Sequence, residues 1–198
     1  MAILVLLRHG RSTFNEENLF TGWIDAPLSK AGIKDALQAK NILRSFNFDA
    51  VFCSSLRRAI DTASLITSAP IVTNSALNER SYGILEGKEK DEMRRKFGEL
   101  QIKIWRRSYD QAPPEGESLK DTFYRVIPYY QECIEPLLKA GKTVLICSHS
   151  NSLRALMKFI EKISDEEIEK VEMPFCIPVI YQLDLMNLQI INKTILQE

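Results

Sequence analysis

Short, uninterrupted apolar runs alternate with longer amphipathic segments along this chain, and this alternation constrains its fold more than any other feature. The apolar runs lie at 3–7, 50–53 and 143–147. The amphipathic segments that follow them lie at 30–46, 56–66 and 153–163. Runs without polar positions are typical of strands covered by helices on both faces. The sequence therefore predicts an α/β protein with a mostly parallel central sheet and helices on both of its faces.

The second half of the chain contains three further structural signals. A long amphipathic helix is expected from Ser118 to Leu138, with a kink at Pro128 and an end at Pro136. The pattern Ser164–Glu167 reads as a capping box that opens a late helix. Strand-like stretches at 179–183 and 189–191 flank a turn, which predicts a hairpin at the C-terminal edge of the sheet.

Length and composition are those of one globular domain covering residues 1–198. The chain has 26 Lys and Arg against 26 Asp and Glu, so no bulk charge attracts it to nucleic acid or to an anionic membrane. The apolar start reaches Arg8 too early to form a signal peptide or a membrane span. The four cysteines have no disulfide or metal-site spacing, which is typical of a cytoplasmic protein.

The chain has only two histidines, and each directly follows a predicted central strand. His9 lies between Arg8 and Gly10, and His149 lies between two serines. Open α/β sheets bind ligands at the carboxyl edge of their parallel strands. One histidine in such a place is more often a hydrogen-bonded core residue, but two at equivalent strand ends favour a functional site.

Phosphoryl transfer is the chemistry that the neighbours of His9 favour. A neutral imidazole is a nucleophile for phosphorus, and an adjacent glycine lets a substrate approach the backbone. A phosphate monoester carries about −1.5 to −2 charge at pH 7 and needs fixed cations, preferably guanidinium groups. The arginines at predicted strand ends and in or beside loops are Arg8, Arg11, Arg57, Arg58, Arg80, Arg106 and Arg107.

Other catalytic classes lack their sequence signatures. The chain contains neither GxxxxGK[ST] nor GxSxG. A cysteine phosphatase needs an arginine after five intervening residues, and those positions are Ala59 for Cys53 and Leu153 for Cys147. Two histidines without an HExxH or DxD cluster give no ligand spacing for a metal, so a metal-independent reaction is expected.

The segment Leu7–Ser12 (LRHGRS) resembles the signature of the histidine phosphatase superfamily, whose nucleophile is the histidine. Other segments resemble the 2,3-bisphosphoglycerate-dependent phosphoglycerate mutases of that superfamily, from residue 3 to about Leu185. These segments are Phe20–Trp23 (FTGW), Pro27–Ser29 (PLS), Leu56–Ile60 (LRRAI), Leu77–Gly83 (LNERSYG), Trp105–Arg107 (WRR), Pro113–Pro114 and His149–Leu156 (HSNSLRAL). The FTGW and WRR elements separate the mutases from the phosphatases.

The resemblance implies a role for each matching residue. His9 is expected to carry the phosphoryl group, with Arg8, Arg58 and His149 around its oxygens and Glu79 as general acid and base. Residues expected to bind the substrate phosphate are Gly10, Arg11, Ser12, Asn15, Thr21, Gly22 and Asn151. Residues expected to hold the carboxylate or second phosphate are Arg80, Tyr82, Lys90, Arg106 and Arg107. A salt bridge from Glu79 to Arg80 is the structural alternative, and Trp23 and Trp105 are expected to pack.

Three departures from the mutase pattern stand out. Arg11 occupies a position where these mutases commonly have Glu, and Ser150 follows His149 where they have Gly. The loop at 112–118 is short, so the insertion and tail of larger mutases are missing. The segment from Tyr82 to Tyr109, rich in basic and aromatic residues, is expected to cover the site.

The function predicted from these residues is the interconversion of 3-phosphoglycerate and 2-phosphoglycerate in glycolysis, primed by 2,3-bisphosphoglycerate. The alternatives are a phosphohistidine-dependent phosphatase of small phosphate monoesters and a non-catalytic module that binds phosphorylated ligands. No nucleic-acid or membrane partner is expected. The sequence leaves open whether the protein is a homodimer or a monomer.

Overall fold

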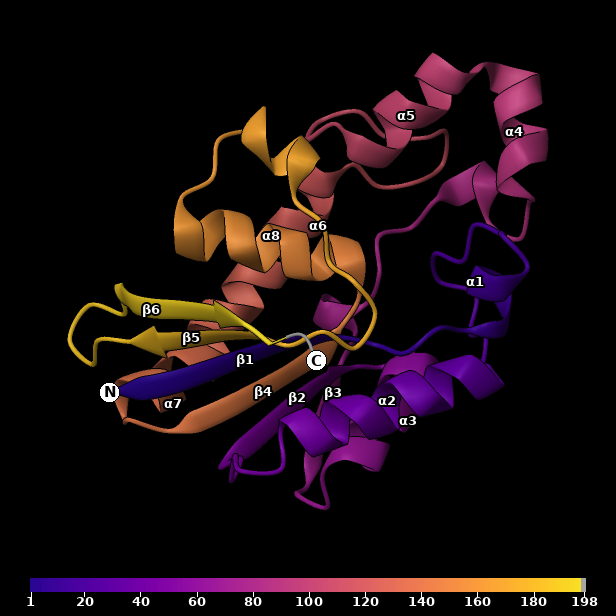
Figure 1. Cartoon of the computed structure of the whole chain (residues 1–198). Coiled ribbons are helices and arrows are strands. Elements are labelled where there is room, and N and C mark those ends of the chain that lie inside the picture. The colour runs from indigo at the N-terminus through magenta and orange to yellow at the C-terminus, as the bar shows by residue number, and fades with distance from the viewer. Residues whose placement is uncertain (197–198) are drawn as a thin grey trace.

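The computed structural model describes residues 1–196 and contains a six-stranded sheet between two layers of helices (Figure 1). The order of the strands is β3-β2-β4-β1-β5-β6. Their bounds are β1 Ala2–Arg8, β2 Ala50–Ser54, β3 Ile71–Asn74, β4 Thr143–Ser148, β5 Val179–Leu183 and β6 Ile190–Ile195. The first four are parallel, whereas β5 and β6 are antiparallel to their neighbours. The predicted mostly parallel sheet and its C-terminal edge hairpin are confirmed.

Alternate residues of the central strands face two different hydrophobic cores. Leu4 and Leu6 of β1 pack into the core beneath α6 (Leu119–Tyr129), α7 (Glu135–Lys139) and α8 (Ser150–Glu161). Val5 and Leu7 pack into the core beneath α2 (Lys30–Ile42) and α3 (Arg57–Ile66). Because both faces are covered, β1 has no position at which a polar side chain reaches water until Arg8.

The predicted helix over 118–138 has a different end from the expected one. Pro128 lies inside α6, and a π-helical segment, η3 (Tyr130–Ile134), follows it. Pro136 does not end the helix, because it occupies the first turn of α7, where its missing N–H needs no partner. The wider π turn between the two prolines lets the chain continue in a helical direction.

The late helix expected after Ser164 is only a single 3₁₀ turn, η4 (Glu167–Lys170). The Ser164 hydroxyl accepts the Glu167 N–H at 3.1 Å, as a capping residue does. The Glu167 carboxylate pairs with Lys170 instead of returning to the cap, so the capping box is not completed. The prediction of a late α-helix was therefore wrong.

An arm projects from the sheet's carboxyl edge, as Figure 1 shows at the upper right. It consists of η2 (Gly83–Leu85), α4 (Lys90–Phe97) and α5 (Glu99–Arg107). The arm has a small core of its own, formed by Phe20, Leu85, Met93 and Ile102. Trp105 packs edge-on against Phe97, which agrees with its expected packing role. Among residues 1–196, no helix is long and apolar enough to cross a membrane.

The loop at residues 9–12 passes so close to α2 that a glycine is required at position 32. A Cβ on Gly32 would lie 1.9 Å from the Arg11 carbonyl oxygen. Glycine to alanine in a helix ordinarily stabilises a protein by about 0.5–1 kcal/mol. Here we expect Gly32→Ala to destabilise it by about 2 kcal/mol or more, because backbone atoms must move.

Chemical denaturation followed by circular dichroism measures this change. Equal or greater stability of the Gly32→Ala protein would contradict the close approach.

Candidate active site

The ends of β1 and β4 bring the two histidines together. Arg8 and Ser148 are register partners at the ends of these parallel strands, so the next residue of each strand leaves the sheet at the same edge. The rings of His9 and His149 lie with their centroids 4.8 Å apart, and both are buried. The predicted meeting of the two histidines at one sheet edge is confirmed.

His9 is held as a neutral imidazole. Its Nδ1 lies 2.6 Å from the carbonyl oxygen of Gly10, which can only accept, so Nδ1 carries the proton. The lone pair of the neutral ring is therefore on Nε2. Burial lowers the pKa of His9 well below its usual value, and the charges of Arg58 and Arg8 lower it further. The ring is thus uncharged at neutral pH, with its one proton on Nδ1.

His149 has one nitrogen satisfied and one unsatisfied. Its Nε2 lies 2.7 Å from the Ser54 hydroxyl, whereas its buried Nδ1 has no hydrogen-bond partner among the described residues. Burial, followed by the charge of Arg58, lowers the pKa of His149 well below its usual value. A bound anion near Nδ1 would reverse this effect, because it favours the protonated ring.

Two arginines flank the histidines, Arg58 buried and Arg8 half-buried. Arg58 donates to the carbonyl oxygens of Gly22 at 2.8 Å and Ile24 at 2.9 Å, which fixes the loop at 22–24. Burial lowers the pKa of Arg58 to about 10, so it stays charged at neutral pH. Arg8 donates to the Met173 carbonyl at 2.8 Å, and its guanidinium lies 3.6 Å from the centroid of the Phe175 ring. Both side chains are therefore fixed cations.

Glu79 is buried on the other side of the site. One of its carboxylate oxygens accepts from the backbone N–H of Arg80 at 2.9 Å and from the Asn151 amide group at 3.1 Å. It does not form a salt bridge with the Arg80 side chain, which donates to the Arg106 carbonyl at 3.1 Å. The structural alternative for Glu79 is thus not the arrangement that the chain adopts.

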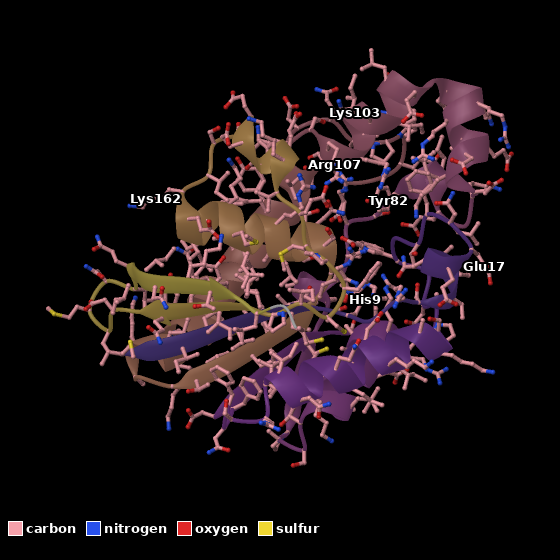
Figure 2. The ribbon with its side chains drawn as sticks, viewed as in Figure 1. His9, Glu17, Tyr82, Lys103, Arg107 and Lys162 are labelled. Carbon is pink, nitrogen blue, oxygen red and sulfur yellow. The ribbon has the colours of Figure 1, made fainter. Side chains whose placement is uncertain are left out.

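Arg8, His9, Arg58 and Glu79 line a cavity of about 130 Å³ beneath the arm. In Figure 2, His9 lies at the edge of the sheet, and Tyr82 and Arg107 lie above it toward the arm. The predicted site residues that line the cavity are Arg8, His9, Asn15, Thr21, Gly22, Arg58, Glu79, Tyr82, Lys90, Arg106, Arg107 and Asn151. Lys90 and Arg106 come from the arm, so the segment from Tyr82 to Tyr109 does contribute to the walls of the cavity.

Several buried polar atoms around this cavity lack a protein partner. They are Arg8 Nε, Thr21 Oγ1, Arg58 Nε, Arg80 Nε and Nη1, His149 Nδ1 and Arg154 Nε. Nearly all are donors, and a buried donor without a partner costs about 1–3 kcal/mol. Such a set fits a polyanionic ligand that accepts many hydrogen bonds.

Arg11 differs from its predicted place. Its guanidinium donates to both carboxylate oxygens of Asp35, at 2.8 and 2.6 Å, and nearly half of the side chain is exposed. Because the chain turns outward after Gly10, Arg11 points toward α2 and not into the cavity. The structure thus assigns Arg11 to a surface ion pair instead of substrate binding.

The remaining predicted residues lie beside the cavity without lining it. Gly10 supplies the carbonyl that orients His9, and its N–H donates to the Thr62 hydroxyl at 3.0 Å. Ser12 is buried and caps α1 (Thr13–Glu16), which carries Asn15. Arg80 and His149 carry unpartnered buried atoms, which are named above.

Two charged residues of the cavity were missed by the sequence reasoning. Arg154 lies one turn after Asn151 in α8, is almost fully buried, and donates to the Asn151 side-chain oxygen at 2.9 Å. The i, i+3 spacing of Asn151 and Arg154 was a usable signal. Glu172 lies in the loop after η4 and pairs with Arg107 at 2.5 Å, and no pattern in the sequence indicated it.

The two buried histidines make stability depend on pH. Their folded-state pKa values lie below the unfolded value of about 6.5, so the unfolded chain binds more protons as the pH falls below that value. We expect the free energy of unfolding to fall between pH 6.5 and about 5, above the usual carboxyl range, by up to about 1.4 kcal/mol per pH unit for each histidine.

Urea denaturation at several pH values measures this slope. A His149→Gln variant should show a shallower slope, because one of the two groups has been removed. A free energy of unfolding that stays constant over this interval would contradict the neutral state of the histidines.

Fold and site together define a phosphohistidine-type enzyme, and a sequence comparison agrees with this class. Residues 4–187 match the family model of the histidine phosphatase superfamily (branch 1), and the chain belongs to this superfamily. It is 50% identical over 201 residues to a 2,3-bisphosphoglycerate-dependent phosphoglycerate mutase of Cytophaga hutchinsonii, covering 97% of this chain and 94% of that protein. It is 45% identical to the corresponding mutase of Chlamydia felis, covering 91% and 93%. The resemblance to these mutases is therefore confirmed.

Solved structures share the fold. A mycobacterial glucosyl-3-phosphoglycerate phosphatase with VO3 has a TM-score of 0.84 at 25% identity, covering 92% of this chain and 93% of that one. YhfR of Bacillus stearothermophilus has a TM-score of 0.84 at 26% identity, covering 96% and 94%. The chain thus shares its overall fold with these structures.

Proposed function

We propose that this protein interconverts 3-phosphoglycerate and 2-phosphoglycerate through a phosphohistidine at His9. The observation that carries the proposal is a single cavity lined by cations from two parts of the fold. Arg8 and Arg58 act on His9, while Lys90, Arg106 and Arg107 reach the cavity from α4 and α5 of the arm. A phosphoglycerate has a phosphate and a carboxylate, so it needs two anion sites within one cavity.

2,3-Bisphosphoglycerate is the primer in this proposal, since it supplies the phosphoryl group that first loads His9. The fit is supported by the unpartnered donors around the cavity, which include Arg8 Nε and Arg58 Nε. Arg8 and Arg58 neutralise the charge that spreads over the phosphoryl oxygens during transfer. His149 donates from Nδ1 once the anion has favoured its protonated form.

Glu79 moves the proton that the substrate hydroxyl loses or gains. When the hydroxyl attacks phosphohistidine, Glu79 takes its proton, the O–P bond forms and the N–P bond to His9 breaks. In the reverse direction Glu79 returns the proton to the leaving oxygen. The hydrogen bonds from the Arg80 N–H and the Asn151 amide hold one carboxylate oxygen in place and leave the other for the substrate.

The cations of the arm explain how the phosphate moves from one oxygen of the glycerate to the other. A molecule with two phosphates must turn round in the cavity so that its other phosphate reaches His9. Lys90 and Arg106 bind whichever anionic group is away from the histidines, so both orientations are stabilised. The residues that line this cavity come from positions 8 to 172, so most of the chain contributes to it. We propose that the chain is a single catalytic domain and that it acts in the cytoplasm.

A phosphatase is the second candidate, because VO3 is bound in a solved structure of similar fold that is a phosphatase. Hydrolysis requires water to reach phosphohistidine, and in this proposal the arm limits that access. A phosphatase also has no need for distal cations that bind both ends of a bisphosphate.

Transfer of the phosphoryl group from 2,3-bisphosphoglycerate to the protein tests the proposal. The wild-type protein, mixed with 2,3-bisphosphoglycerate labelled with ³²P, should retain label that is lost in acid and stable in base, as phosphohistidine is. Peptide mapping should place the label on His9. Label on another residue, or none at all, would contradict the proposal.

A further inference from the structure

The segment that carries Glu79 has no regular secondary structure of its own. It follows η1 (Ser75–Leu77) and runs extended through Asn78 to Ser81, outside the sheet. Its backbone carbonyls therefore depend on side chains from other elements for hydrogen bonds. The position of the Glu79 carboxylate in the cavity depends on how these carbonyls are held.

One side chain, Arg125 of α6, binds two of these carbonyls and a third in η1. Its Nη1 donates to Ala76 O at 2.8 Å and to Asn78 O at 2.9 Å. Its Nη2 donates to the Glu79 carbonyl oxygen at 2.9 Å. The guanidinium thus spans the turn that delivers Glu79 to the site.

Glu117 fixes the guanidinium from the opposite side. Its two carboxylate oxygens accept from Arg125 Nε and Nη2, each at 2.9 Å. One of the same oxygens also accepts the backbone N–H of Ser81 at 2.9 Å. The pair therefore holds the chain on both sides of Glu79, and every nitrogen of the Arg125 guanidinium is engaged.

A third contact comes from the loop that lines the other side of the cavity. The indole Nε1 of Trp23 donates to the Glu79 carbonyl oxygen at 2.6 Å, although half of the Trp23 surface is exposed. The carbonyl of Glu79 thus has two donors, from Trp23 and Arg125. Trp23, which was expected to pack, is thus a hydrogen-bond donor to the segment that carries Glu79.

We propose that Arg125, fixed by Glu117, is a positioning residue for the proton transfer by Glu79. Neither residue lines the cavity, so neither touches the substrate. The proposal rests on the proposed function in that it takes Glu79 as the general acid and base. A displacement of about 1 Å at a catalytic group can cost about 10²-fold in rate.

A comparison of two phosphoryl donors isolates the proton transfer. In both reactions His9 Nε2 forms the N–P bond and the P–O bond breaks. With 2,3-bisphosphoglycerate the leaving oxygen is an alkoxide, which needs the proton of Glu79. With p-nitrophenyl phosphate the leaving oxygen is a phenolate, a far weaker base, which departs without a proton.

The experiment measures the rate of phosphohistidine formation from each donor in a rapid-mixing instrument. The variants are Arg125→Lys, Arg125→Met and Glu117→Gln. We expect the rate from 2,3-bisphosphoglycerate to fall about 10- to 100-fold, with the methionine variant slower than the lysine variant. The rate from p-nitrophenyl phosphate should change less than about threefold, and so should the substrate concentration at half-maximal rate.

Glu161→Gln is the matched control for Glu117→Gln. Both carboxylates pair with a cation, and both side chains are 19% exposed. Glu161 is the last residue of α8, eleven residues beyond Ser150, and bonds Tyr181 and Lys193 away from the site. The control should leave both rates unchanged.

The outcomes separate this proposal from the proposed function. Equal losses with both donors would overturn the positioning role. So would a loss in the Glu161→Gln control as large as that in Glu117→Gln. If the wild-type protein takes no phosphoryl group from 2,3-bisphosphoglycerate, the proposed function fails, and 3-phosphoglycerate then serves as the alkyl donor for the same comparison.

Discussion

Replacement of His9 by alanine should reduce turnover of 3-phosphoglycerate at least about 10⁴-fold, which is the largest effect that we expect of any substitution. The reason is that the N–P bond has no alternative place to form. His149 lies beside His9, but its Nε2 is occupied by the Ser54 hydroxyl and its Nδ1 is placed to donate to the anion.

The affinity of the His9→Ala protein for 3-phosphoglycerate shows whether only the nucleophile is lost or the whole binding site. His9→Ala removes no cation, so the protein should still bind 3-phosphoglycerate within about tenfold of the wild-type affinity, as measured by calorimetry. Unfolding should occur at a similar or higher temperature at low pH, because a buried histidine has been removed. Residual turnover within about 100-fold of wild type would show that another group accepts the phosphoryl group.

Glu79→Gln should lower kcat for 3-phosphoglycerate by about 10² to 10⁴-fold with a much smaller change in KM. The amide has nearly the shape of the carboxylate and still accepts from the Arg80 N–H, but it cannot exchange a proton with the substrate. Phosphorylation of His9 by p-nitrophenyl phosphate should survive, since its leaving group needs no proton.

Steady-state kinetics with both donors checks this result. Glu86→Gln provides a comparison at another carboxylate, which bonds Ser81 and Tyr82 beside the cavity and contacts no reacting atom in the proposed mechanism. A Glu79→Gln protein with unchanged kcat would remove Glu79 from proton transfer. A loss that appears only in KM would assign it to binding.

The sheet and the histidine pair were predictable because their signals are local. An apolar run without polar positions predicts a buried strand, and a parallel sheet brings the ends of its strands to one edge. His9 and His149 each directly follow such a strand. The edge hairpin was equally accessible, since 179–183 and 189–191 flank a short turn.

The parts that the sequence did not reveal depend on contacts between distant segments. Arg125 is an ordinary position of an amphipathic helix, and only the folded chain brings it to the carbonyls of 76, 78 and 79. Arg11 carries the same charge as Arg8, and the direction of the chain after Gly10 decides that it meets Asp35. Pro136 was misjudged because the effect of a proline depends on which turn of a helix contains it.

In the proposed function, the cavity moves a phosphoryl group between two oxygens of one glycerate. The most direct test follows 3-phosphoglycerate with EDTA present, with and without a trace of 2,3-bisphosphoglycerate, and measures both 2-phosphoglycerate and inorganic phosphate. We predict that 2-phosphoglycerate forms, depends on the primer and greatly exceeds the phosphate released. Inorganic phosphate as the main product, or no reaction of the folded protein, would contradict this account.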